Sequence, residues 1–258
     1  MGTYSHSRLS TFEQCPFKFK LKYIDKIIPE IDTTIEALLG NCVHSALEWL
    51  YNNLNSKAGK IPSTDEVLTA YIAAWEQEFF PEIKIVRNNT TPKDYFNKGI
   101  KFLVDYCNRH SPFEDNTLET EKQILINLDE KGEHKIQGFI DRLAYNPETG
   151  EYEIHDYKTS NSLPTKEKIE ADRQLALYSI AIKEIFGNDK KVCLIWHYLA
   201  HDAKICSSRT NEQLAQLKKE TIKLIKKIEN TTEFPACTSA LCNWCEYNYM
   251  CEEFKKRH

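Results

Sequence analysis

The chain has 258 residues, a formal net charge of −4 and a charged fraction of 28%. This length can bury a sizeable core, and the composition is that of an ordinary globular domain. No run of about 18 apolar residues exists, so we expect neither a transmembrane helix nor a membrane partner. The first residues lack the apolar stretch of a secretory signal, and a cytoplasmic location is therefore expected.

The net charge argues only mildly against a nucleic-acid-binding protein, because such domains usually carry a basic footprint. The lysines of this chain are clustered in 18–26, in 218–227 and at the C-terminus. Carboxylates that bind metal also lower the formal charge without opposing phosphate binding. The overall charge therefore decides little about the class of ligand.

Helical patterns dominate the first half of the chain. Apolar residues recur at roughly helical spacing over 7–23, and Pro16 predicts a break and a restart of the helix at the proline. An amphipathic helix is expected over 35–54, and further helices over 63–80, with Ser63 or Thr64 as N-cap, and over 94–109. The last two predict a helical insertion at about 51–117, whose aromatic side chains we expect to pack rather than to stack on bases.

Strand patterns begin near residue 118 and continue over 135–143 and up to Lys158. The segment 146–150 has the composition of a hairpin turn with Gly150 in the left-handed conformation. A helix over 166–186, a buried strand over 192–199, a lysine-rich helix over 210–229 and an irregular cysteine-rich end follow. This order predicts an α/β or α+β fold, and we choose α/β, a short mixed sheet covered by helices in one domain, 1–258.

The predicted hairpin carries the first candidate site. Asp141 lies on one strand and Asp156 on the next, where Lys158 shares its face because side chains alternate along a strand. Two carboxylates beside an amine can hold Mg²⁺ or Mn²⁺ and orient a water for phosphodiester hydrolysis. An exposed hairpin with an ordinary surface ion pair explains this stretch equally well.

Two helices offer partners to this hairpin. His44 and Glu48 are four residues apart on the helix of 35–54 and share a face, so His44 could supply a nitrogen ligand that favours Mn²⁺. Gln174 and Tyr178 have the same spacing on the helix of 166–186 and could reach a phosphate or the lysine. By spacing alone, a structural histidine and a half-buried tyrosine are the commoner outcomes.

The nine cysteines indicate a metal site or buried thiols rather than disulfides, because the chain has no export signal. Cys242, Cys245 and Cys251 lie within ten positions of one another, one ligand short of a closed four-ligand site. The fourth ligand is Cys15 or Cys237. We expect the other four to be plain buried residues: Cys42, Cys107, Cys193 and Cys206.

Taken in order, these motifs resemble a known family. They are Ser7-x-Leu9-x-x-Phe12-x-x-Cys15-Pro16, Gly40-x-x-x-His44-x-x-x-Glu48, Gly138-Phe-Ile-Asp141-Arg142, Asp156-Tyr-Lys158-Thr159-Ser160, Gln174-x-x-x-Tyr178 and the C-terminal Cys-x-x-Cys-x(5)-Cys. The chain resembles the RecB-like branch of the PD-(D/E)xK nuclease superfamily, with the iron–sulfur architecture of AddB-type and CRISPR-associated Cas-four-type nucleases. The match is weakest over 51–118.

The resemblance implies a restriction-endonuclease-like core whose termini are joined by a 4Fe–4S cluster, formed by Cys15 and the region 237–258. It implies that the catalytic residues are Asp141, Asp156 and Lys158, and that the Mg²⁺ or Mn²⁺ ligands are His44, Asp141 and Asp156. The implied cluster ligands are Cys15, Cys242, Cys245 and Cys251, in place of Cys237. It gives supporting roles to Gln174 and Tyr178. Arg142 and Glu48 recur near the site in the family without an assigned role here, and Glu121 is a weaker candidate for a site acid.

The expected function is that of a metal-dependent DNA exonuclease or endonuclease, acting on single strands or DNA ends in repair, recombination or CRISPR adaptation. The expected partners are DNA and a helicase or CRISPR-adaptation proteins. The alternative is a DNA-binding or assembly module of a larger complex with little activity alone. The absence of a Gly-x-x-x-x-Gly-Lys-[Ser/Thr] motif makes such dependence on a partner reasonable.

Overall fold

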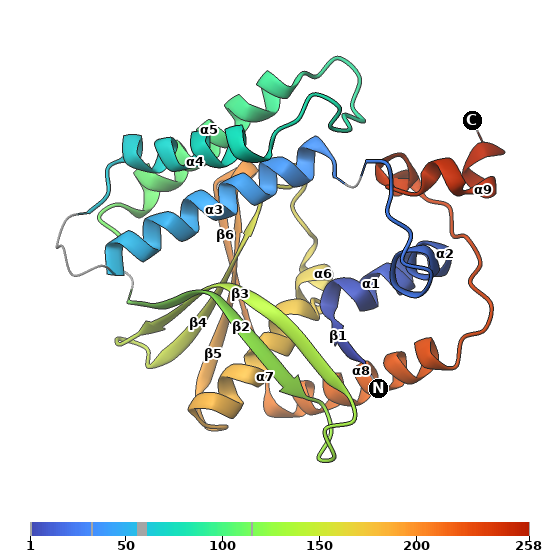
Figure 1. Ribbon diagram of the computed structural model, residues 1–258. Coiled ribbons are helices and arrows are strands. Elements are labelled where there is room, and N and C mark those ends of the chain that lie inside the picture. The colour runs from blue at the N-terminus through green and yellow to red at the C-terminus, as the bar shows by residue number, and fades with distance from the viewer. Residues whose placement is uncertain (1, 32, 56–60, 115, 258) are drawn as a thin grey trace.

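A mixed sheet of six strands lies between two layers of helices (Figure 1). The computed structural model describes residues 2–31, 33–55, 61–114 and 116–257. Residues 56–60 and 115 of the predicted insertion, and both ends of the predicted domain 1–258, lie outside the described residues. The strands are β1 (Thr3–Ser5), β2 (Thr117–Asn127), β3 (Lys135–Asn146), β4 (Glu151–Lys158), β5 (Lys191–Tyr198) and β6 (Ala203–Ser208).

The strand order is β1-β3-β4-β5-β6, and β2 also pairs with β3. The pairs β1–β3 and β4–β5 are parallel, whereas β2–β3, β3–β4 and β5–β6 are antiparallel. The connection between the parallel strands β4 and β5 passes through α7, as parallel pairs require a crossover. The predicted mixed sheet flanked by helices is confirmed.

The α-helices are α1 (His6–Gln14), α2 (Pro16–Phe19), α3 (Ile35–Asn55), α4 (Thr64–Glu78), α5 (Pro92–His110), α6 (Lys166–Glu170), α7 (Gln174–Phe186), α8 (Asn211–Glu229) and α9 (Glu252–Lys255). A π-helical turn, η1 (Lys20–Ile24), continues α2, and short 3₁₀ turns are η2 (Leu199–His201), η3 (Ala240–Trp244) and η4 (Asn248–Met250). Among the described helices, none is long and apolar enough to cross a membrane.

Each face of the sheet has its own hydrophobic core. One core joins α1, α7 and α8 to the sheet through residues such as Leu9, Ile140 and Leu177. The other core joins α3, α4 and α5 to the side of the sheet that carries Tyr157. The aromatic residues of the predicted insertion, Tyr71 among them, lie in this second core, so their predicted packing role is confirmed. Burial of each large apolar side chain contributes about 1.5–3 kcal/mol.

Several boundaries of helices and turns that local sequence signals predict agree with the structure. Pro16 is the first residue of α2, and the Ser63 side chain and Glu66 form the capping box that opens α4. Gly150 closes the β3–β4 turn with a φ of +70°, as a hairpin with a left-handed glycine requires. The predicted hairpin of 138–158 is therefore present, with β3 and β4 antiparallel.

Two predictions of local structure were wrong. The helix expected over 166–186 is interrupted, because the Asp172 carboxylate accepts the Leu175 N–H and begins α7 as a separate helix. Cys42 and Cys107 are buried as expected, but Cys193 is half-buried and Cys206 is exposed. The physical reason is that Cys206 lies on β6, an edge strand with one solvent-facing side, which the sequence did not predict.

Candidate active site

The strands β3 and β4 part at the candidate site. Their pairing runs from Asn146 opposite Glu151 to Arg142 opposite His155, and in the described ladder β4 then pairs with β5 alone. Asp141 is the next residue of β3, and its Oδ2 accepts the Tyr157 backbone N–H at 2.9 Å. A carboxylate thus takes the place of a strand carbonyl and holds the two strands where they diverge.

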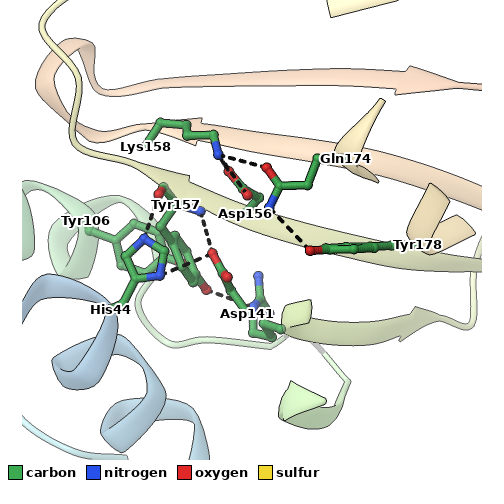
Figure 2. Close-up of polar contacts among 9 residues, drawn as sticks. His44, Tyr106, Asp141, Asp156, Tyr157, Lys158, Gln174 and Tyr178 are labelled. Carbon is green, nitrogen blue, oxygen red and sulfur yellow. Dashed lines mark hydrogen bonds and ion pairs between the residues drawn. The ribbon is translucent and has the colours of Figure 1, made fainter. Parts of the chain in front are cut away.

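His44 reaches this point from α3, which lies over the sheet (Figure 1), and its ring is beside Asp141 and Tyr157 (Figure 2). Its Nε2 lies 2.7 Å from the Tyr157 carbonyl oxygen. A carbonyl only accepts, so Nε2 carries the proton and donates it. The other nitrogen, Nδ1, then faces Asp141 Oδ2 at 3.4 Å. The peptide units of Tyr157 therefore orient both the carboxylate and the imidazole.

Glu121 completes this group from β2. One ligand atom from each of His44, Glu121 and Asp141 lies within 4.8 Å of the other two. Glu121 has a φ of +44°, a left-handed conformation that costs a non-glycine residue about 1–2 kcal/mol. Its neighbours Thr120 and Lys122 stay in register with β3. The backbone is therefore strained at the one position of β2 whose carboxylate belongs to this group.

The electrostatics of the group favour an added cation. Burial raises the pKa of Asp141 to about 6, an effect that His44 opposes and Asp156 reinforces. Burial, together with the charges of Asp141 and Glu48, raises the pKa of Glu121 to about 7. These carboxyl groups hold their protons more tightly because burial and neighbouring carboxylates both disfavour the ionised form. Two carboxylates and an imidazole nitrogen are suitable ligands for Mg²⁺ or Mn²⁺, so the residues fit a divalent cation.

Asp156 and Lys158 form the second half of the site. The Lys158 Nζ lies 2.9 Å from Asp156 Oδ1 and 2.7 Å from Oδ2. It also donates to Gln174 Oε1 at 3.5 Å, and Gln174 Nε2 donates to the Tyr178 hydroxyl at 3.5 Å (Figure 2). Burial alone would lower the pKa of Lys158, but the Asp156 carboxylate reverses this and raises it. The ammonium therefore stays charged at neutral pH.

Arg142 holds the Tyr157 side chain on the side of the sheet that α3 covers. Arg142 is 1% exposed, and its Nε donates to the Tyr157 hydroxyl at 3.0 Å. Its guanidinium also lies 4.0 Å from the centre of the Tyr51 ring. These contacts immobilise the Tyr157 side chain, whose own peptide units orient His44 and Asp141.

The predicted site residues therefore come together as two adjacent groups. The first contains His44 and Asp141, and the second contains Asp156, Lys158, Gln174 and Tyr178. The Asp156 carboxylate is directed to Lys158 and is outside the group of three. Sequence reasoning underrated Glu121, because a left-handed residue is invisible to a pattern based on regular alternation. Its only signal was an acidic residue on the strand that pairs with β3.

The C-terminal cysteines lie against the start of the chain. Cys15 Sγ accepts the Cys237 backbone N–H at 3.4 Å, and Glu246 pairs with Lys18 at 2.6 Å. The Lys84 ammonium donates to the Cys245 carbonyl at 3.1 Å. In the described ranges no three cysteine sulfurs all lie within 4.8 Å of one another, as the ligand atoms of His44, Glu121 and Asp141 do. The contacts join the two ends of the chain without forming a compact thiolate site.

Comparison with known proteins identifies a family whose model matches the chain and a solved structure with a similar fold. The model of the family described as the PD-(D/E)XK nuclease superfamily matches residues 3–252. A crystal structure from Eubacterium rectale, described as a candidate exonuclease, has 14% identity and a TM-score of 0.57, over 95% of this chain and 88% of that one. At this identity the likeness concerns the fold alone. The structure of SSO0001 has 18% identity and a TM-score of 0.37, over 92% of this chain and 94% of that one. No curated protein gives a significant match.

Proposed function

Since the chain belongs to the PD-(D/E)XK nuclease superfamily, we propose that it is a metal-dependent deoxyribonuclease of the RecB-like branch. The observation that carries this proposal is the convergence of His44, Glu121 and Asp141 beside the Asp156–Lys158 pair. The proposed substrate is DNA, as single strands or ends, cleaved in an exonuclease or endonuclease mode.

The proposed roles follow from the geometry of each side chain. His44, Glu121 and Asp141 would hold Mg²⁺ or Mn²⁺, with Asp156 as a further ligand, since its charge acts on Asp141. When bound, such a cation supplies Lewis acidity to the phosphodiester and to the attacking water. The Asp141 carboxylate is held in place without a cation, because it accepts the Tyr157 backbone N–H where β3 and β4 stop pairing.

Lys158 is proposed to act as a hydrogen-bond donor and a fixed positive charge. Its raised pKa keeps the ammonium protonated at neutral pH, so it does not serve as a general base in this state. Asp156 and Gln174 orient the ammonium from two sides, which suits it to steady a water or a phosphate oxygen as negative charge develops. Tyr178 in turn supports Gln174.

A nuclease panel tests this proposal. Wild-type protein, purified without oxygen, is incubated with labelled single- and double-stranded, linear and circular DNA in Mg²⁺, in Mn²⁺ and in chelator. We expect cleavage that needs the cation and falls at least about 100-fold in Lys158→Ala, the scale of a lost electrostatic stabiliser. Lys166→Ala is the matched control, because Lys166 is exposed on α6 and pairs only weakly with Glu170. Equal cleavage by wild type and Lys158→Ala would refute the assignment of the site.

A 4Fe–4S cluster held by Cys15, Cys242, Cys245 and Cys251 is the proposed clamp between the chain ends. Two observations support it: the contact of Cys237 N–H with Cys15 Sγ, and the ion pair of Lys18 with Glu246, the residue next to Cys245.

The colour and metal content of the protein test this clamp. Anaerobically purified wild type should be brown, with about four irons per chain, and Cys245→Ser should lose both colour and stability. Cys237→Ser is the control, because Cys237 is exposed and contributes only its backbone N–H to Cys15. Colourless protein with stoichiometric zinc would contradict the proposal. A cytoplasmic location and a helicase or CRISPR-adaptation partner stay predictions from the sequence.

A further inference from the structure

Cys193 and Cys206 are neighbours on two antiparallel strands. In the β5–β6 ladder Cys193 is opposite Ser208 and Ile195 is opposite Cys206, so the two cysteines share a face and are diagonal to each other. Side chains at such diagonal positions are neighbours, and the two thiols interact with each other. The fold therefore brings together two thiols that are 13 positions apart in the chain.

This pair is separate from both sites described above. Asp156 and Lys158 are opposite Trp196 and Tyr198 on β5, and these even-numbered positions point to the other face of the sheet from Cys193. The C-terminal cysteines lie against α2 instead. Cys206 is exposed on the edge strand β6, and Cys193 is half-buried, so solutes can reach the pair.

The surroundings shift the pKa values of the two thiols in opposite directions. Interaction with the neighbouring Cys193 thiol lowers the pKa of Cys206 to about 6, with burial and Glu153 opposing and Lys204 assisting. The same contact and burial raise the pKa of Cys193. Burial raises the pKa of Cys42 to about 12 and that of Cys107 to about 11. A thiolate beside a protonated thiol is the usual arrangement of an attacking and a resolving cysteine.

We propose that Cys206 and Cys193 form a peroxide-reactive pair that closes to a reversible disulfide. The Cys206 thiolate attacks one peroxide oxygen, the O–O bond breaks, and the departing hydroxide takes a proton to become water. Cys193 then attacks the Cys206 sulfenic acid: an S–S bond forms, the S–O bond breaks, and a second water leaves. Two thiols are oxidised by two electrons and one hydrogen peroxide is reduced to two waters.

The edge position of β6 allows this closure. Diagonal residues in an antiparallel pair are about 7–8 Å apart, whereas a disulfide prefers a Cα separation of about 5.5–6 Å. β6 must therefore slide by a fraction of a residue along β5, because the two strands are already paired side by side. In the described sheet β6 pairs with β5 alone, so no second strand opposes this movement. The resulting link would tie the edge strand to the strand that adjoins β4.

Peptide mass spectrometry after peroxide treatment tests the proposal on the full-length, cluster-loaded protein. Trypsin separates Cys193 and Cys206 into peptides 192–204 and 205–209, because it cleaves after Lys191, Lys204 and Arg209. We expect hydrogen peroxide to join these two peptides with the loss of two hydrogens, and dithiothreitol to separate them. In the same digest, Cys107 should stay reduced at that dose.

Two variants identify the order of attack. In Cys193→Ser the sulfenic acid on Cys206 has no resolving partner, so a dimedone probe should label peptide 205–209 more strongly than in wild type. In Cys206→Ser, Cys193 should stay unlabelled at the same dose. Both variants should keep wild-type nuclease activity when reduced, since neither cysteine lies in the proposed catalytic groups. If Cys206 reacts no faster than Cys107, or if peptides 192–204 and 205–209 never join, the proposal is wrong.

Discussion

The Asp141 carboxylate accepts the backbone N–H of Tyr157 at 2.9 Å, at the place where β3 and β4 stop pairing with each other. The carbonyl of the same Tyr157 accepts from His44. One residue of β4 therefore sets the positions of two side chains from other elements, and it lies between Asp156 and Lys158 in the chain. The two halves of the candidate site are coupled through this backbone.

Asp141→Asn should stabilise the metal-free protein at alkaline pH. Asp141 has a folded pKa of about 6 against an ordinary 3.8, so the folded state binds this proton more tightly than the unfolded chain. Its contribution to stability is therefore lost as the pH rises from about 4 to about 6. We expect chelator-treated Asp141→Asn to exceed wild type by about 1–3 kcal/mol at pH 8, and by less at pH 5. Denaturant unfolding of both proteins at pH 8 and pH 5 measures this difference in unfolding free energy. A variant less stable than wild type at pH 8 would contradict it.

Glu121→Gln should weaken divalent-cation binding without unfolding the protein. The amide keeps the size of the side chain but removes one of the two carboxylate charges in the group of His44, Glu121 and Asp141. We expect Mn²⁺ affinity to fall about 10–100-fold by titration calorimetry, about 1.4–2.8 kcal/mol. Glu119→Gln is the control, since Glu119 is an exposed residue of the same strand that pairs with Lys122. Unchanged affinity in Glu121→Gln would remove Glu121 from the site.

Gly138→Ala should displace Tyr178. A Cβ at Gly138 would lie 2.6 Å from the Tyr178 ring and hydroxyl, nearer than real contacts allow. We expect a loss of about 1–3 kcal/mol in unfolding free energy and a lower kcat, because Gln174 loses its support. Gly40→Ala is the control: its Cβ would meet Thr159 at an ordinary 3.5 Å, and alanine suits helix α3 better than glycine. A Gly138→Ala protein as active and stable as wild type would contradict this packing.

Asp156→Asn should destabilise the protein by leaving Lys158 without its anion. Asp156 is 3% exposed, but Lys158 keeps a third of its side chain in solvent, so we expect a modest loss of about 1–3 kcal/mol. The double variant Asp156→Asn/Lys158→Met should recover part of this stability, because no unpaired charge is left. Thermal unfolding of wild type, Asp156→Asn, Lys158→Met and the double variant gives the coupling free energy between the two side chains. A coupling free energy near zero would mean that Asp156 and Lys158 do not stabilise each other.

Local patterns predicted the hairpin and its turn well, because alternation and a left-handed glycine are short-range features. They placed Asp156 and Lys158 on one face of β4, which the structure confirms. They could not bring His44 to Asp141, since α3 and β3 meet only through tertiary packing. The resemblance to known nucleases supplied that pairing.

Two misses have specific physical causes. Glu121 departs from regular strand geometry, so its direction cannot be inferred from alternation. The strand β6 has only one large apolar side chain, Ile205, in six residues, and its pattern was too weak to recognise. The exposure of Cys206 follows from that edge strand and was therefore missed with it.

The most direct test of the central claim is the anomalous scattering of Mn²⁺ in crystals of the wild-type protein. A site built by the Tyr157 backbone and the three ligands should give one strong peak in contact with His44, Glu121 and Asp141. The Asp156 carboxylate should turn towards this peak if it is a further ligand. Well-ordered crystals with saturating Mn²⁺ and no peak among these three residues would contradict the account.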